Sequence, residues 1–238
     1  MSREVLSLKQ AAEHVHLELN ELRHIAQRGE IEALLRGEDW YFEHRALDEW
    51  AQRELLVASH REQLRRHSLI VAEERRARQQ DLRIAELFKT GSLSLSMSGK
   101  TKAGAIREMA DLAARTGLVY DAEGLYRELK EREDIASTAV GEGAAFLHPR
   151  FHDPYLFEES FIAYARASYP VFFGAPEGEP TRHFFLICST DHEQHLKILS
   201  RLAVMAHATE FLSILDEAES VETVQGIIRS AEEALIGL

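Results

Sequence analysis

The stretch that decides the fold of the larger part of this chain reads Gly141-Glu142-Gly143-Ala144-Ala145-Phe146-Leu147-His148-Pro149-Arg150. Two glycines separated by one residue predict a turn, and the apolar residues that follow predict a short strand. Pro149 restricts His148 to extended backbone, so we expect the strand to end at this imidazole and to expose it. Because imidazole changes charge near neutral pH, His148 is a candidate for chemistry.

Helices and strands alternate around this segment. Serines alternating with apolar residues predict an extended segment at 91–100, and apolar runs predict strands at 161–173 and 183–190. Apolar residues at helical spacing predict further helices at 101–116, 122–132, 195–207 and 221–238. Residues 81–238 are therefore expected to form an α/β layered domain.

The first 55 residues follow a different pattern. Ser7 and Gln10 have the spacing of a capping box ahead of a first helix, and Gly29 ends a second one. Apolar residues on both sides of a turn at 36–39 predict a hairpin, and a third helix follows. Residues 56–80 contain no Gly or Pro and predict a connecting helix, which leaves a homodimer open.

This order of helices and hairpin resembles the winged helix-turn-helix domains of the excisionase and MerR type. The matching residues are Ala11 and Ala12, Gly29-Glu30-Ile31, Trp40-Tyr41-Phe42 and Leu47-Asp48-Glu49-Trp50. The resemblance implies that bases would be contacted by the outer face of the second helix and by the wing, through Asn20, Arg23, His24, Gln27 and Arg36. Residues 1–50, however, hold six basic and eleven acidic residues, a poor balance for a duplex. DNA binding and the docking of another protein both stay open.

Composition excludes several other classes of protein. The 238 residues are 45% hydrophobic and carry a net charge of -12, which indicates a folded chain whose acidic body repels phosphate backbones. We found neither a run of about 18 apolar residues nor a basic and apolar N-terminus, so we expect a cytoplasmic protein without membrane insertion. The single cysteine, Cys188, lies in an apolar run, and we expect it to be buried.

Residues 81–238 resemble the fructose-mannitol type of enzyme IIA domain of the bacterial phosphotransferase system, including its nitrogen-regulatory relatives. The motifs appear in the family's order as Lys100–Ile106, Arg132-Glu133, Ser137-Thr138, the strand ending at His148, and His195-Leu196-Lys197-Ile198-Leu199. The resemblance implies a small mixed sheet flanked by helices, with His148 as phospho-acceptor, His195 as its neighbour and Arg132 facing the phosphate. The chain departs from the family at Leu147 and Pro149, because the family strand usually ends in Pro-His.

The function implied by this resemblance is that of a regulatory phosphocarrier or phosphorylation sensor, rather than a turnover enzyme. We found no nucleotide-binding glycine loop and expect no cofactor, so the phosphoryl donor would be a phosphocarrier protein of the same system. The alternative is a DNA-binding transcriptional regulator whose enzyme IIA-like domain is not phosphorylated. We expect no metal site from His148, His152, Asp153 and His195, because Pro149 and Pro154 prevent the helix that would align His148 with His152, and no thiolate assists.

Overall fold

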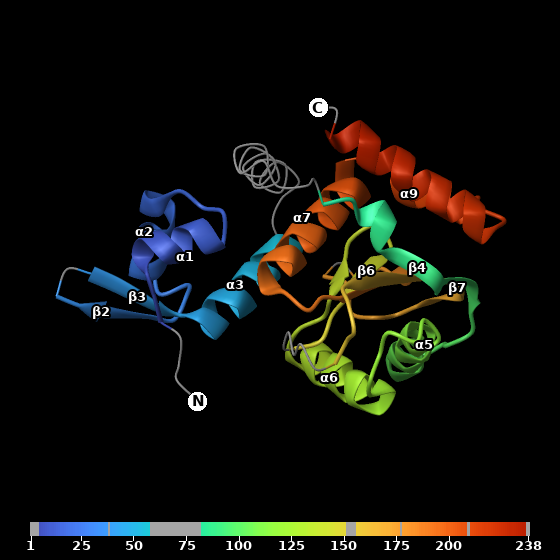
Figure 1. The fold of residues 1–238 in the computed structure, drawn as a ribbon, viewed down its shortest axis with the longest axis horizontal. Coiled ribbons are helices and arrows are strands. Elements are labelled where there is room, and N and C mark those ends of the chain that lie inside the picture. Colours follow the sequence, from blue (N-terminus) through green and yellow to red (C-terminus); the bar gives the residue numbers. More distant parts are fainter. Residues whose placement is uncertain are drawn as a thin grey trace. The chain divides into compact units, whose positions relative to one another are not determined.

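The computed structural model describes residues 5–37, 39–57, 82–150, 156–176, 178–208 and 210–236. The chain divides into two compact units, Met1–Asp81 and Leu82–Leu238 (Figure 1). Beyond Val57, the connecting helix expected over 56–80 lies outside the described residues, as do His152 and Asp153.

The first unit combines short helices with a small antiparallel sheet. Its elements are β1 (Val5–Ser7), α1 (Leu8–His14), α2 (Leu19–Gln27), β2 (Ala33–Arg36), β3 (Asp39–Glu43) and α3 (His44–Val57). The strand order is β1-β3-β2, and the capping box of Ser7 and Gln10 opens α1 as expected. Gly29 follows α2 with φ of 71°, in the left-handed region that glycine tolerates best.

A compact apolar core holds this unit together. Leu22 of α2, Phe42 of β3 and Leu47 of α3 are fully buried, beside Ala11 and Ala12 of α1. Helices and hairpin are present at the positions that the sequence pattern predicted. Strand β1 had no signal in the sequence, because three residues are too few for a periodic pattern.

The second unit is a mixed sheet between helices. Its elements are the 3-10 helix η1 (Ile84–Leu87), β4 (Phe88–Met97), α5 (Lys102–Ala114), α6 (Ala122–Ile135), β5 (Ala139–Val140), β6 (Ala144–Leu147), β7 (Phe161–Val171), β8 (Thr181–Cys188), α7 (His192–Ala208), α8 (Phe211–Asp216) and α9 (Val221–Ile236). The strand order is β4-β7-β8-β6-β5. Strand β4 pairs in parallel with β7, and β6 in parallel with β8, whereas the other two pairings are antiparallel. The expected α/β class with a small mixed sheet flanked by helices is confirmed.

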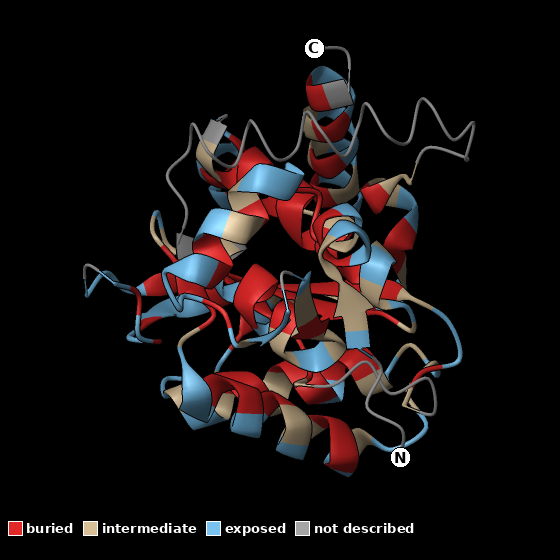
Figure 2. Ribbon diagram, turned by 90° about the vertical axis from the view of Figure 1, so that its left-hand side faces the viewer, coloured by how far each residue is buried: buried red, intermediate tan, exposed pale blue. Residues whose placement is uncertain are grey.

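The two faces of this sheet are covered by different helices. Helices α5 and α6 lie on one face, and α7 and α9 on the other (Figure 1). Successive residues of β8 therefore enter different layers: Phe184 and Cys188 pack with α5 and α6, and Phe185 lies in an aromatic contact with Phe211 of α8. Figure 2 shows the buried residues gathered on the strands and on the inward sides of the helices.

Cys188 is fully buried, as predicted. Burial raises the pKa of its thiol well above the ordinary value, so the residue is an apolar filler of the core rather than a nucleophile. In the part of the chain that the structure describes, no helix has the length and hydropathy needed to cross a membrane.

Candidate functional site

His148 lies at the end of the sheet where the parallel strands β6 and β8 finish. It follows the last residue of β6, and the neighbouring strand β8 continues from the same end into α7. The side chain of His148 is only 1% exposed, so the prediction of an exposed imidazole was wrong. Pro149 restricts the backbone of His148 but has no influence on what covers its side chain, which here includes residues from the end of α6 and the start of α7.

The hydrogen bonds of His148 define its tautomer. The ring nitrogen Nδ1 lies 2.9 Å from the carbonyl oxygen of Phe146, and a carbonyl only accepts, so Nδ1 carries the proton. The other nitrogen, Nε2, then accepts from the Nε–H of Arg132 at 3.1 Å. The nucleophilic lone pair of His148 is therefore on Nε2 and faces the guanidinium of Arg132.

Arg132 is itself held in place from the last turn of α6. Its side chain is buried, and Nη1 donates to the carbonyl oxygen of Ala136, the C-cap residue of the helix, at 2.9 Å. The guanidinium thus uses two different nitrogens for two acceptors. A planar guanidinium would also suit a phosphoryl group, because its N–H donors match the spacing of phosphoryl oxygens.

His195 approaches His148 from the face of the sheet that α7 covers, opposite to the face covered by α6 (Figure 1). It lies in the first turn of α7, where the Asp191 carboxylate accepts from the backbone N–H of Gln194 at 2.8 Å. The ring of His195 is fully buried, and its centroid is 4.9 Å from that of His148. The N-terminal end of a helix favours negative charge, so this position suits a neighbour of a phosphorylated residue.

A buried carboxylate fixes the segment that carries Arg132. Glu133 accepts hydrogen bonds from the backbone N–H of Thr138 at 3.0 Å and from its hydroxyl at 2.6 Å. It also forms an ion pair with Lys102 at 2.9 Å. Residues of three separate sequence motifs therefore meet at one carboxylate, beside Arg132. No local pattern predicts this contact, because Lys102 and Glu133 are on different helices.

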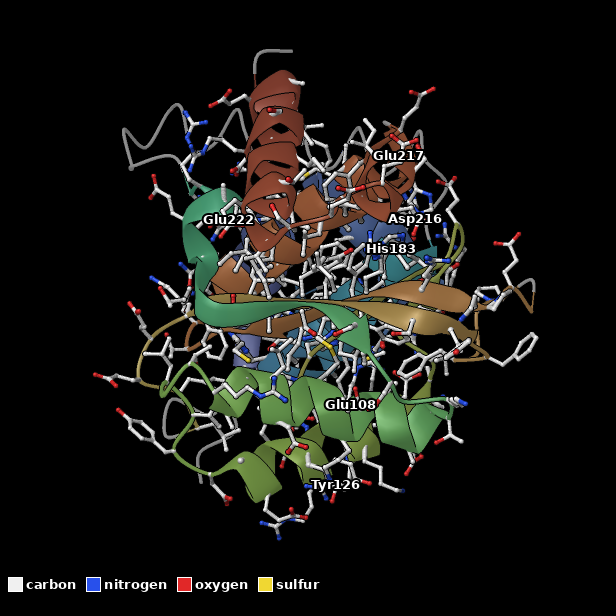
Figure 3. The ribbon with its side chains drawn as sticks, turned by 90° about the vertical axis from the view of Figure 1, so that its right-hand side faces the viewer. Glu108, Tyr126, His183, Asp216, Glu217 and Glu222 are labelled. Carbon is white, nitrogen blue, oxygen red and sulfur yellow. The ribbon has the colours of Figure 1, made fainter. Side chains whose placement is uncertain are left out.

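The inner strands β7 and β8 carry a second polar cluster that sequence reasoning missed. The hydroxyl of Tyr164 lies 2.9 Å from Nδ1 of His183, and the carboxylate of Asp216 is 3.5 Å from Nε2 of the same ring. His183 and Asp216 are labelled in Figure 3 on the side of the sheet opposite to Glu108 and Tyr126. Burial lowers the pKa of His183 to about 4 and raises that of Tyr164. Arg182 pairs with Asp216 at 2.7 Å, so this cluster ties the end of α8 to the sheet.

The residues expected to contact DNA lie on the surface of the first unit. On α2, Leu22 and Ile25 are buried, whereas Asn20, His24 and Gln27 are exposed, so the predicted orientation of the helix is confirmed. Arg23 is half-buried and donates to the side-chain oxygen of Asn20 at 3.2 Å. The predicted contact residue of the wing, Arg36, is exposed at the end of β2, above the ring of Tyr41.

Comparison with known proteins identifies relatives of the second unit. Residues 86–231 match the family described as "Phosphoenolpyruvate-dependent sugar phosphotransferase system, EIIA 2". The fructose-specific EIIA component of the phosphotransferase system of Haloferax volcanii is 33% identical over 143 residues, which is 59% of this chain and 91% of that protein. The fructose-specific EIIABC component of Bacillus subtilis is 28% identical over 154 residues, 64% of this chain but only 24% of that longer protein.

A solved structure shows the same arrangement. The nitrogen regulatory protein IIA-Ntr of Neisseria meningitidis is 26% identical, with a TM-score of 0.56 over 61% of this chain and 98% of its own. The three matches cover 59 to 64% of the chain, slightly less than the share of the second unit, Leu82–Leu238.

Proposed function

The chain belongs to the EIIA 2 family of the phosphoenolpyruvate-dependent sugar phosphotransferase system, and from this premise we propose that it is a phosphocarrier that accepts a phosphoryl group on Nε2 of His148. The observation that carries the proposal is the pair of hydrogen bonds on this ring, which leaves the proton on Nδ1 and the lone pair on Nε2. The names of the relatives, fructose-specific components and a nitrogen regulatory protein, support a role in carrying or sensing phosphate.

The transfer itself requires no proton to leave the acceptor ring. The lone pair on Nε2 attacks the phosphorus, the bond between phosphorus and the donor side chain breaks, and that side chain keeps the electron pair. His148 retains its Nδ1 proton, which stays hydrogen-bonded to the carbonyl oxygen of Phe146. The work left to the protein is positioning and charge stabilisation, as in other phosphoryl transfers.

Arg132 has two successive roles in this scheme. Its Nε–H first occupies Nε2, so the guanidinium must move before the phosphorus can approach. The same N–H groups then stabilise the phosphoryl oxygens, with the first turn of α7 at His195 on the other side. The donor in this proposal is a phosphorylated carrier protein of the same system.

The decisive experiment is phosphorylation of the full chain. Incubation with phosphoenolpyruvate and the general phosphotransferase proteins should add one phosphate, measured by intact mass, that is labile in acid and stable in base. His148→Ala should abolish the addition, whereas the matched control His24→Ala removes an exposed imidazole of the first unit and should leave it unchanged. Full labelling of His148→Ala, or none of the wild type with active donors, would contradict the proposal.

We further propose that the first unit couples this phosphorylation to recognition of a macromolecule by the outer face of α2. The exposed Asn20, His24 and Gln27 support this role, and the resemblance to winged helix-turn-helix domains favours DNA. Binding to a duplex should weaken steeply with salt, and Arg23→Ala should cost about 1 to 3 kcal/mol at one base pair. A folded protein that binds no duplex at low salt would instead indicate docking of another protein.

A further inference from the structure

Three metal-ligating side chains meet in the first unit, at residues that neither the family match nor the predicted DNA surface includes. His14 ends α1, whereas His44 and Asp48 lie one turn apart at the start of α3. The Nε2 atom of His14 is 2.7 Å from Oδ1 of Asp48, and Nδ1 of His44 is 3.2 Å from Oδ2. One nitrogen or oxygen atom from each residue lies within 4.8 Å of the other two.

The ligand types and their spacing point to a transition metal. Two imidazoles and one carboxylate are a common set for zinc and for other divalent ions of the first transition row. Around a tetrahedral zinc ion, bond lengths near 2.0 to 2.1 Å place neighbouring ligand atoms about 3.3 Å apart. The two contacts to Asp48, 2.7 and 3.2 Å, are made to different carboxylate oxygens, and one ligand atom of each residue lies within 4.8 Å of the others. Side-chain rotations that bring the three ligand atoms to this spacing would admit an ion.

The surroundings of the three residues also suit a bound ion. His14 and Asp48 are largely buried, with 14% and 15% of their side chains exposed, so the local structure limits their rotation. His44 is 32% exposed and leaves a path for the ion and for a water molecule as fourth ligand. The two imidazole rings, with centroids 4.5 Å apart and an angle of 53° between them, converge on the same carboxylate.

We propose that His14, His44 and Asp48 bind one divalent transition-metal ion, most suitably Zn²⁺. The ion would join the end of α1 to the start of α3, two elements that are 30 residues apart in sequence, and would stabilise the first unit. In the sequence, metal ligands were sought only around His148, and no site was expected there. The missed signal is the spacing of His44 and Asp48, four residues apart on one helix face.

Cobalt binding to the full chain tests the site directly. Metal-free protein titrated with Co²⁺ should develop visible d–d absorption at one equivalent, and Zn²⁺ should displace it. Loss of a residue that only orients a metal ligand typically weakens metal binding by about 10- to 100-fold. Asp48→Asn and His44→Ala change the ligands themselves and should weaken metal binding by at least as much. Glu49→Gln, which neutralises an exposed carboxylate of the same helix, is the matched control and should bind as the wild type does.

Tryptophan fluorescence gives an independent readout. Both tryptophans, Trp40 and Trp50, belong to the first unit, so the fluorescence midpoint of thermal unfolding reports this unit alone. Zn²⁺ should raise that midpoint in the wild type and in His148→Ala, but not in Asp48→Asn or His44→Ala. Absence of Co²⁺ absorption in folded wild-type protein would overturn the proposal. So would absorption that survives in Asp48→Asn and His44→Ala and disappears in His148→Ala, because the ion would then lie at the phosphorylation site.

Discussion

Replacement of Arg132 by lysine tests whether the guanidinium fork is needed for phosphoryl transfer. In the unphosphorylated protein, Nε of Arg132 donates to His148 at 3.1 Å and Nη1 donates to the Ala136 carbonyl at 2.9 Å. A lysine has a single nitrogen and cannot reach both acceptors from one position. Arg132→Lys therefore keeps the positive charge but loses one of the two contacts.

The expected size of the effect follows from the contact that is lost. A hydrogen bond from a charged donor contributes about 1.5 to 3 kcal/mol, and each 1.36 kcal/mol in the barrier is tenfold in rate. The contact with neutral His148 in the resting state is weaker than one with a charged phosphoryl group, so only part of the loss is offset. We expect phosphorylation of Arg132→Lys to be about 10- to 100-fold slower than that of the wild type.

The assay is a single-turnover measurement with excess phosphorylated donor, followed by intact mass at timed intervals. Arg127→Lys is the matched control on the same helix, because the side chain of Arg127 is 67% exposed and its removal leaves the site intact. A rate for Arg132→Lys equal to that of the wild type, with an unchanged circular dichroism spectrum, would refute the role that we assign to the fork.

Three further predictions concern stability. Glu232→Gln should destabilise the second unit by about 3 kcal/mol, because the carboxylate accepts from the backbone N–H groups of Ile84 and Ala85 and pairs with buried Arg201. The midpoint of urea unfolding measured by circular dichroism should decrease, whereas the midpoint measured by tryptophan fluorescence of the first unit should not change. Thr138→Val should cost about 1.5 to 3 kcal/mol in the same measurement, since its hydroxyl donates to buried Glu133; an unchanged midpoint would contradict this. The pKa of His183 is about 4 in the folded chain and near 6.5 in the unfolded chain, so the unfolded chain binds the proton first as the pH falls. The stability should therefore be complete above pH 6.5 and decrease by up to about 3 kcal/mol as the pH decreases toward 4. His183→Gln should flatten this pH dependence of stability, and equal slopes for both proteins would disprove the prediction.

Local patterns in the sequence predicted most of the second unit. Apolar runs located β7 and β8, and helical spacing located α5, α6 and α9, because these elements are long enough to show a period. The short elements β1, η1 and α8 were missed, since three to six residues carry no periodic signal. The site residues His148, Arg132 and His195 came from family motifs, and the structure brings all three together.

Contacts between distant residues could not be predicted in this way. Lys102 and Glu133, or His14 and Asp48, meet only because separate elements pack together, and no local pattern records such a meeting. The burial of His148 was missed for the same reason. The restriction that Pro149 imposes concerns only the backbone of His148. The exposure of the His148 side chain depends instead on the other elements that pack over it.

The burial of His148 makes side-chain movement a necessary step of the proposed transfer. Its ring is 1% exposed, and its nucleophilic nitrogen is occupied by Arg132. The backbone beside Arg132 is fixed, because Glu133 binds the amide and hydroxyl of Thr138. The movement that frees Nε2 should therefore be a rotation of the Arg132 side chain, with α6 left in place. Because the Ala136 carbonyl lies at the end of this helix, Nη1 can keep that acceptor as a pivot while Nε turns away from the ring.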